Sequence, residues 1–152
     1  MRVALGADVN GYRMKEAIRG HLASLGHDVV DFGGAEGDEL DYPDVAVPVT
    51  RAVAAGEVDR AVLICGTGLG MAIVANKVPG VRAAPVTDPY SAERAIKSNN
   101  AQVLCLGAKV VGVEVAELLL DHWMGSDFAG GASARKVAKI EAMDAVRAEV
   151  RP

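Results

Sequence analysis

The chain is 152 residues long, which suits one domain and is long enough to bury a hydrophobic core. Its net charge is −4 at pH 7, and acidic and basic residues are interspersed without a basic stripe, so we expect no nucleic-acid partner. The apolar runs are too short to cross a bilayer and the first residues predict a strand instead of a signal peptide, so we expect a cytoplasmic protein with no membrane partner.

The first third of the chain alternates between strand and helix patterns. A strand is predicted over residues 2–8, and an apolar stripe over 14–25 has the spacing of one helix face. A second strand is predicted over 28–32 and, after an acidic loop, a second helix over 42–56. Pro48 is awkward inside this helix because it removes a hydrogen bond and clashes one turn back, so we expect it in the first turn or at a kink.

The rest of the chain continues the alternation. The expected elements, in order, are strand 60–65, helix 69–78, strand 81–87, helix 90–98, strand 103–107, a helix carrying residues 115–123 and a last helix over 133–150. The apolar stripes of the last two helices are Val115, Leu118, Leu119, His122 and Trp123, and then Val137, Ile140, Met143 and Val146.

Five strands, each followed by a helix, require parallel pairing with right-handed crossovers. We therefore expect a doubly wound α/β fold: a five-stranded parallel sheet in a single domain spanning 1–152, with an extra C-terminal helix. That last helix lies outside the repeat, so we expect it to pack on a partner subunit. Ligands of such sheets sit beyond the carboxyl ends of the strands. The residues at those ends are Asp8, Cys65 to Gly70, Asp88 and Lys109.

The turn Cys65-Gly66-Thr67-Gly68-Leu69-Gly70 is the most informative stretch of the sequence. Three alternating glycines between a buried strand and a helix allow backbone N–H groups to point at an anion. The spacing is not the dinucleotide-binding fingerprint, because Met71 stands where its third small residue belongs, and no Gly-Lys-Ser/Thr follows as in a Walker loop. A plain tight turn between strand and helix remains the alternative.

Cys65 sharpens the interpretation of this turn. It lies at a helix N-terminus, where the helix dipole favours a thiolate, and Thr67 is close enough in sequence to bond its sulfur. The alternative is a buried core cysteine, which fits Cys105 well. The two cysteines have no motif spacing, so neither a disulfide scaffold nor a metal site is predicted. An aldose–ketose isomerase needs a base and donors for an enediolate, and Cys65 with the glycine turn supplies both.

Short motifs that follow in order over residues 1–140 resemble a known family. They are Asp8 with Gly11, Asp41-Tyr42-Pro43-Asp44, Cys65-Gly66-Thr67-Gly68 with Gly70, Ala75-Asn76-Lys77, Val81-Arg82-Ala83-Ala84, Tyr90-Ser91-Ala92, Asn99 with Ala101, Leu106-Gly107-Ala108 and Gly130-Gly131. Together they resemble the type B ribose-5-phosphate isomerases and the galactose-6-phosphate isomerase subunits. The resemblance implies a Rossmann-like fold, no metal and no organic cofactor, and a homodimer or dimer of dimers with shared active sites.

The resemblance also implies roles for individual residues. Cys65 would be the proton-transfer base and Thr67 its helper. The amides of the turn would cradle the enediolate, and the glycines concerned are Gly66, Gly68 and Gly70. The residues implied to touch the sugar are Asp8, Tyr42 and, from the neighbouring subunit, Asn99. Arg82 is left out of the predicted site, because an arginine at the start of a strand often pairs with an acid.

Several positions depart from the family pattern. The histidine usually found after the first aspartate is Val9, and the histidine that opens the sugar ring is Ser98. The usual phosphate-binding arginines are replaced, and the residues in or near those positions are Lys109, Ala132, Arg135 and Lys136. Lysine holds phosphate as a point charge without the fork of arginine. Ser98 has no useful acid–base character near neutral pH, so a ring-forming substrate would have to open spontaneously or with the help of another group. A short sugar phosphate that cannot cyclise, such as a tetrulose phosphate, would need no such help.

The leading hypothesis is an aldose–ketose isomerase acting on a small sugar phosphate, with ribose 5-phosphate and ribulose 5-phosphate as the nominal pair. Two alternatives stay open. One is a non-catalytic or half-catalytic subunit of a hetero-oligomeric isomerase, which retention of Cys65 argues against. The other is a sugar-phosphate binding module that uses the anion cradle without turnover.

Overall fold

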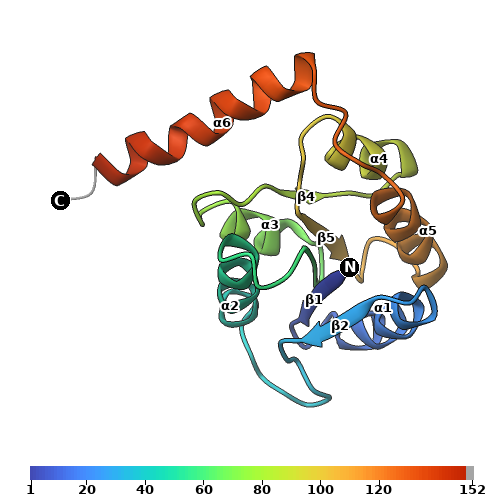
Figure 1. The fold of residues 1–152 in the computed structure, drawn as a ribbon. Coiled ribbons are helices and arrows are strands. Elements are labelled where there is room, and N and C mark those ends of the chain that lie inside the picture. Colours follow the sequence, from blue (N-terminus) through green and yellow to red (C-terminus); the bar gives the residue numbers. More distant parts are fainter. Residues whose placement is uncertain (150–152) are drawn as a thin grey trace.

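A computed structural model describes residues 1–149, with a parallel sheet between two layers of helices (Figure 1). The strands are β1 (Arg2–Ala7), β2 (Asp28–Asp31), β3 (Arg60–Cys65), β4 (Ala83–Pro85) and β5 (Val103–Gly107). The helices are α1 (Tyr12–Ser24), α2 (Tyr42–Ala54), α3 (Leu69–Ala75), α4 (Pro89–Lys97), α5 (Val113–Met124) and α6 (Ala132–Glu149). The sheet order is β2-β1-β3-β5-β4 and every pairing is parallel. The predicted five-stranded, doubly wound α/β fold is confirmed.

Each face of the sheet carries its own hydrophobic core. On β1, Val3 and Leu5 point toward the core shared with α1, α4 and α5, whereas Ala4 points toward the core shared with α2 and α3. The central strand β3 has no exposed residue, since both of its faces are covered by helices. This burial explains why the central strands read as continuous apolar runs, and it holds their carboxyl ends in fixed positions.

Two local predictions are wrong in detail, and a third is narrowed. Pro48 lies beyond the first turn of α2, inside the helix, which leaves the kink as the remaining prediction. Strand β4 is limited to Ala83–Pro85, because it lies at the edge of the sheet and has β5 as its one partner. On α5 the buried face includes Leu120 and Met124 in place of Val115 and Leu118, which stay exposed. Both apolar faces of α5 have helical spacing, and packing on α4 decides which of them is buried.

Helix α6 departs from the body of the domain (Figure 1). Val137 is buried, whereas Ile140 and Met143 are 45% and 65% exposed. The stripe expected on this helix is therefore largely uncovered within one chain, and its expected end at Val150 lies outside the described residues. Packing of α6 on a partner subunit stays a prediction. None of the described helices combines the length and the apolar character needed to span a membrane.

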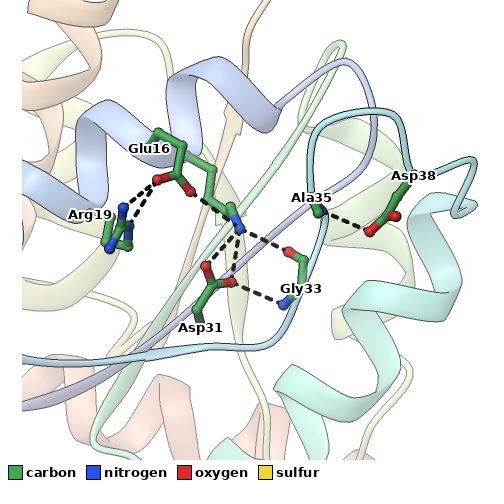
Figure 2. A network of polar contacts seen from close by, with 7 residues as sticks. Glu16, Arg19, Asp31, Gly33, Ala35 and Asp38 are labelled. Atoms are coloured by element: carbon green, nitrogen blue, oxygen red, sulfur yellow. Dashed lines mark hydrogen bonds and ion pairs between the residues drawn. The ribbon is translucent and has the colours of Figure 1, made fainter.

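A buried lysine fixes the turn that follows β2 (Figure 2). The Lys15 ammonium donates to both carboxylate oxygens of Asp31, at 2.9 and 2.7 Å, and to the carbonyl oxygen of Gly33 at 3.3 Å. The side chain of Lys15 is only 3% exposed, while that of Asp31 is 36% exposed. Asp31 also accepts from the amide of Gly33, so one ion pair orders the start of the segment that leads to α2.

This arrangement predicts unequal effects for the two partners. Asp31→Ala leaves the buried Lys15 charge without its main partner, and we expect the free energy of unfolding to fall by roughly 2–4 kcal/mol. Lys15→Met removes the buried charge and keeps the apolar stem, so we expect a smaller loss. Urea denaturation of both variants measures the two values. An equal or larger loss for Lys15→Met contradicts this account of the pair.

Candidate active site

The carboxyl ends of β1, β3 and β5 meet at one edge of the sheet. Ala7 pairs with Ile64, and Cys65 pairs with Gly107, so the residues that follow these strands are neighbours. The chain crosses to β2 on one side of β1 and to β3 on the other, which makes this edge the topological switch point. Ligands of doubly wound sheets bind at such a point.

Cys65 ends β3 and faces the turn that opens α3. Its side chain is buried, and the amide of Gly68 donates a hydrogen bond to its sulfur at 3.1 Å. Gly68 has φ +77°, a left-handed conformation that glycine adopts without a steric penalty. The hydroxyl oxygen of Thr67 accepts from the amide of Leu69 at 3.3 Å, and the hydrogen bond to the Cys65 sulfur comes from the amide of Gly68. Thr67 is exposed at the mouth of the turn.

The turn is packed so closely that neither Gly107 beside it nor Gly70 within it has room for a side chain. A Cβ placed on Gly107 would lie 2.7 Å from the backbone carbonyl of Thr67. A Cβ on Gly70 would lie 2.8 Å from the ring of Tyr42, so the two residues are in contact. The glycine at position 107 therefore belongs to the geometry of the turn, although its own strand is β5.

Asp8 follows β1 and is held rigidly. Its residue is 7% exposed, and one carboxylate oxygen accepts from the amides of Asn10 and Gly11 at 2.9 and 3.1 Å. Gly11 lies against the carbonyl of Ile64, where a Cβ would come within 2.6 Å of the oxygen. The loop after β1 is thereby pressed against the end of β3, which brings the Asp8 carboxylate to the same edge as Cys65.

Lys109 and Asn10 flank the first glycine of the turn. A Cβ on Gly66 would lie 3.7 Å from the Lys109 side chain and 3.9 Å from that of Asn10, and the amide of Lys109 donates to the Gly66 carbonyl at 3.0 Å. Lys109 was predicted from sequence as a substrate-binding residue, whereas Asn10 was not. Its place two residues after Asp8, at the end of a parallel strand, is the signal that could have identified it.

A cavity of about 300 Å³ opens beside the loop after β1. Its lining residues are Val9, Asn10, Tyr12, Arg13, Glu36 and Gly37. Arg13 supplies a cation and Glu36 an anion to this cavity, and neither residue was predicted from sequence as part of the site. Val9, at the position where the family pattern has a histidine, contributes an exposed apolar side chain.

Four predicted substrate residues are not brought to this edge within one chain. Ser98 and Asn99 follow α4 and precede β5, so they lie beyond the amino end of the sheet. Five strand residues at about 3.3 Å each place them roughly 15 Å from the carboxyl edge. Arg135 and Lys136 are exposed on α6, which starts at Ala132.

The second cysteine differs from Cys65 in its surroundings. Burial raises the pKa of the Cys105 thiol, and the nearby Cys65 raises it further. Cys105 therefore stays protonated at neutral pH, and its side chain is buried inside β5. In the part of the chain that the structure describes, no three His, Cys, Asp or Glu side chains are grouped in a way that could hold a metal ion.

Comparison with known proteins places this geometry in a family. Residues 3–140 match the model of the family described as Ribose/Galactose Isomerase. The chain belongs to this family. It is 46% identical over 144 residues to ribose-5-P isomerase B of Listeria innocua serovar 6a, covering 95% of this chain and 97% of that protein. It is also 49% identical over 144 residues to D-erythrulose-4-phosphate isomerase 2 of Mycolicibacterium smegmatis, covering 92% and 95%.

A solved structure of the ribose/galactose isomerase family has the same fold. The Clostridium thermocellum ribose-5-phosphate isomerase B superposes with a TM-score of 0.95 at 42% identity, covering 97% of this chain and 99% of that one. The resemblance seen in the sequence motifs is thus confirmed at the level of family and fold, and with it the expectation of an enzyme from an isomerase family.

Proposed function

We propose that the chain is an aldose–ketose isomerase that acts on a small sugar phosphate through proton transfer by Cys65. The observation that carries the proposal is the Cys65 sulfur, held by the Gly68 amide at the mouth of the glycine turn and at the same sheet edge as Asp8. A thiolate at this point has a fixed position, and the amides of the turn supply donors next to it. Family membership supports the same reaction class.

In the proposed mechanism Cys65, as thiolate, removes the proton from the carbon beside the substrate carbonyl. The electron pair of the broken C–H bond moves into an enediolate, whose negative charge is held by the amides of the turn. Thr67, exposed at the turn, donates to the substrate oxygens. Cys65 then returns the proton to the former carbonyl carbon, while the proton of the neighbouring hydroxyl passes to the former carbonyl oxygen by way of the Thr67 hydroxyl, so atoms and charge balance without a co-reactant. Asp8 accepts hydrogen bonds from the sugar hydroxyls, and Tyr42 covers the turn.

We further propose that the complete site is shared between subunits of a homodimer or dimer of dimers. Lys109 lies beside the turn of its own chain, and we propose that it binds the phosphate group of a substrate held by that turn. The residues proposed to come from the neighbouring subunit are Ser98, Asn99, Arg135 and Lys136. Support comes from their positions away from the carboxyl edge and from the exposed apolar side chains of Ile140 and Met143 on α6. We also propose that the enzyme acts in the cytoplasm, because its proposed substrate is a metabolic sugar phosphate.

The substrate we propose is a four-carbon ketose or aldose phosphate that stays open-chain. Ser98 offers no acid–base group to open a ring, and a four-carbon sugar phosphorylated at its end cannot form one. The Mycolicibacterium relative named D-erythrulose-4-phosphate isomerase 2 supports this choice, at 49% identity. The Listeria relative named ribose-5-P isomerase B, at 46%, keeps the five-carbon pair as the alternative.

A substrate panel tests this choice. We expect kcat/KM for a tetrulose 4-phosphate to exceed that for ribose 5-phosphate by roughly tenfold or more, because general acid–base help with ring opening is missing. Ser98→His should narrow this ratio by raising activity on ribose 5-phosphate. A wild-type preference for ribose 5-phosphate overturns the substrate assignment. Absence of isomerisation across all aldose and ketose phosphates of four to six carbons overturns the proposed function.

A further inference from the structure

Arg82 lies just before the edge strand β4, and hydrogen bonds from its guanidinium join two separate segments of the chain. It is only 9% exposed. Its Nε donates to the carbonyl oxygens of Asn99 and Asn100, at 3.2 and 3.0 Å. Its Nη1 donates to Glu141 of α6 at 3.1 Å and to the carbonyl oxygen of Gly80 at 3.4 Å. A single buried guanidinium therefore connects the segment after α4 to the last helix.

These two segments carry the predicted substrate residues that lie away from the carboxyl edge. Asn99 is in direct contact with Arg82 through its carbonyl, and Ser98 precedes it. Arg135 and Lys136 are on α6, between one and two turns before Glu141. The contact with α6 is reinforced by Asp144, whose carboxylate accepts from the amide of Gly80 at 2.7 Å.

The backbone at this point is also held in an uncommon conformation. Asn100 has φ +48° and is the one non-glycine residue with positive φ among residues 1–149. Its amide donates to Ile96 at 2.9 Å, which is the bond of a left-handed helix cap. The cap and the two bonds from Arg82 together leave Asn99 a single backbone orientation.

We propose that Arg82 is a positioning residue for the active site of the neighbouring subunit, setting both the Asn99 segment and α6. The inference rests on the proposed function, because it requires Asn99 and the α6 cations to act in the partner's site. Arg82 itself does not touch the substrate. Its planar fork bonds carbonyls and a carboxylate at the same time, which a lysine cannot reproduce.

Arg60 provides a matched control within the same chain. It is half-buried at the start of β3, and its guanidinium donates to the carbonyls of Trp123 and Ser126, each at 2.8 Å, at the end of α5. Arg60 thus resembles Arg82 as an arginine that bonds backbone carbonyls near a helix C-terminus, but its partners lie in no segment of the proposed site.

The first experiment compares Arg82→Met with Arg60→Met, both assayed on the best substrate well below their unfolding temperatures. Both variants should unfold at lower temperature than wild type. Arg82→Met should lower kcat/KM by roughly 10- to 100-fold, the usual effect of a small misplacement of site groups, and Arg60→Met by less than about twofold. Equal effects on kcat/KM in the two variants overturn the proposal.

The second experiment asks in which subunit Arg82 acts. A Cys65→Ala chain and an Arg82→Met chain are co-expressed with different tags, and the mixed dimer is purified through both tags. If Arg82 serves the neighbouring site, one of the two sites receives intact Cys65 and intact Arg82, and activity returns to about half that of wild type. If Arg82 serves its own site, neither site is intact and activity stays at the level of the mutants, which overturns the proposal.

A parallel mixed dimer of Cys65→Ala with Asn99→Ala tests the sharing of the site between subunits separately from the role of Arg82. Restored activity with Asn99→Ala but not with Arg82→Met leaves the shared site standing and overturns the role of Arg82 alone. Restoration in neither mixture, with an active wild type, overturns the sharing of the site and with it the proposed role of Arg82.

Discussion

Replacing Cys65 with alanine is expected to lower kcat by roughly 10²- to 10⁴-fold, the usual contribution of a positioned proton-transfer group. The Cys65 sulfur is the atom that the turn of residues 66–70 surrounds, and the amide of Gly68 points at it from 3.1 Å. Removing the sulfur leaves the cradle in place but takes away the base. Binding of the substrate should therefore change much less than turnover, and steady-state kinetics with a separate binding measurement checks both.

Cys105→Ala is the matched control for this substitution. Cys105 is buried in β5, and burial raises the pKa of its thiol so that it stays protonated. We expect kcat within about threefold of wild type and a modest loss of stability from the small cavity. A kcat for Cys65→Ala as high as that of Cys105→Ala would contradict the assignment of the base.

Gly107→Ala is expected to disable the site from a neighbouring strand. The new Cβ would meet the backbone of Thr67 at 2.7 Å, and backbone atoms at this distance must move apart. Because the turn of residues 66–70 orients the amide donors, we expect kcat/KM to fall by roughly 10²-fold. Overpacking should also lower the free energy of unfolding by about 1–3 kcal/mol. Kinetics and urea denaturation of the same preparation measure the two effects.

Gly20→Ala tests whether the effect depends on location. Gly20 lies within α1, and a Cβ there meets nothing within 4 Å. Alanine is the better helix former, so we expect the free energy of unfolding to rise by about 0.5–1 kcal/mol with kcat/KM unchanged. If Gly107→Ala left kcat/KM as close to wild type as Gly20→Ala does, the close packing of β5 on the turn would have no catalytic role.

The fold could be predicted because the central strands are short apolar runs separated by helical stripes. Residues 60–65 contain no polar residue after Arg60, and a parallel sheet with helices on both faces follows from such runs. The buried face of α5 could not be predicted, since Leu118 and Leu120 are equally apolar and packing selects between them. Likewise, Pro48 was expected in the first turn of α2 or at a kink, and the structure places it inside the helix.

The residues of the candidate site, too, could be predicted from sequence only in part. Asp8, Cys65 and Lys109 could be selected from sequence because each follows a strand, and parallel strands bring such residues to one edge. Asn10 and Arg13 were missed because their role depends on how the loop after β1 folds against Gly66 and the cavity. Arg82 was expected to pair with an acid, and it does pair with Glu141. Its bonds to carbonyls 17 and 18 residues away leave no trace in a sequence pattern.

The most direct test of the central claim is exchange of the substrate proton with solvent. Wild type and Cys65→Ala are incubated in D₂O with sugars of four to six carbons, with and without phosphate, and deuterium beside the carbonyl is followed by NMR. We expect wild type to incorporate deuterium into phosphorylated sugars, fastest into a four-carbon one, and Cys65→Ala to do so at least about 100-fold more slowly at the same enzyme concentration. Exchange by Cys65→Ala at a rate close to that of wild type, or no exchange by wild type with any sugar, would contradict proton transfer by Cys65.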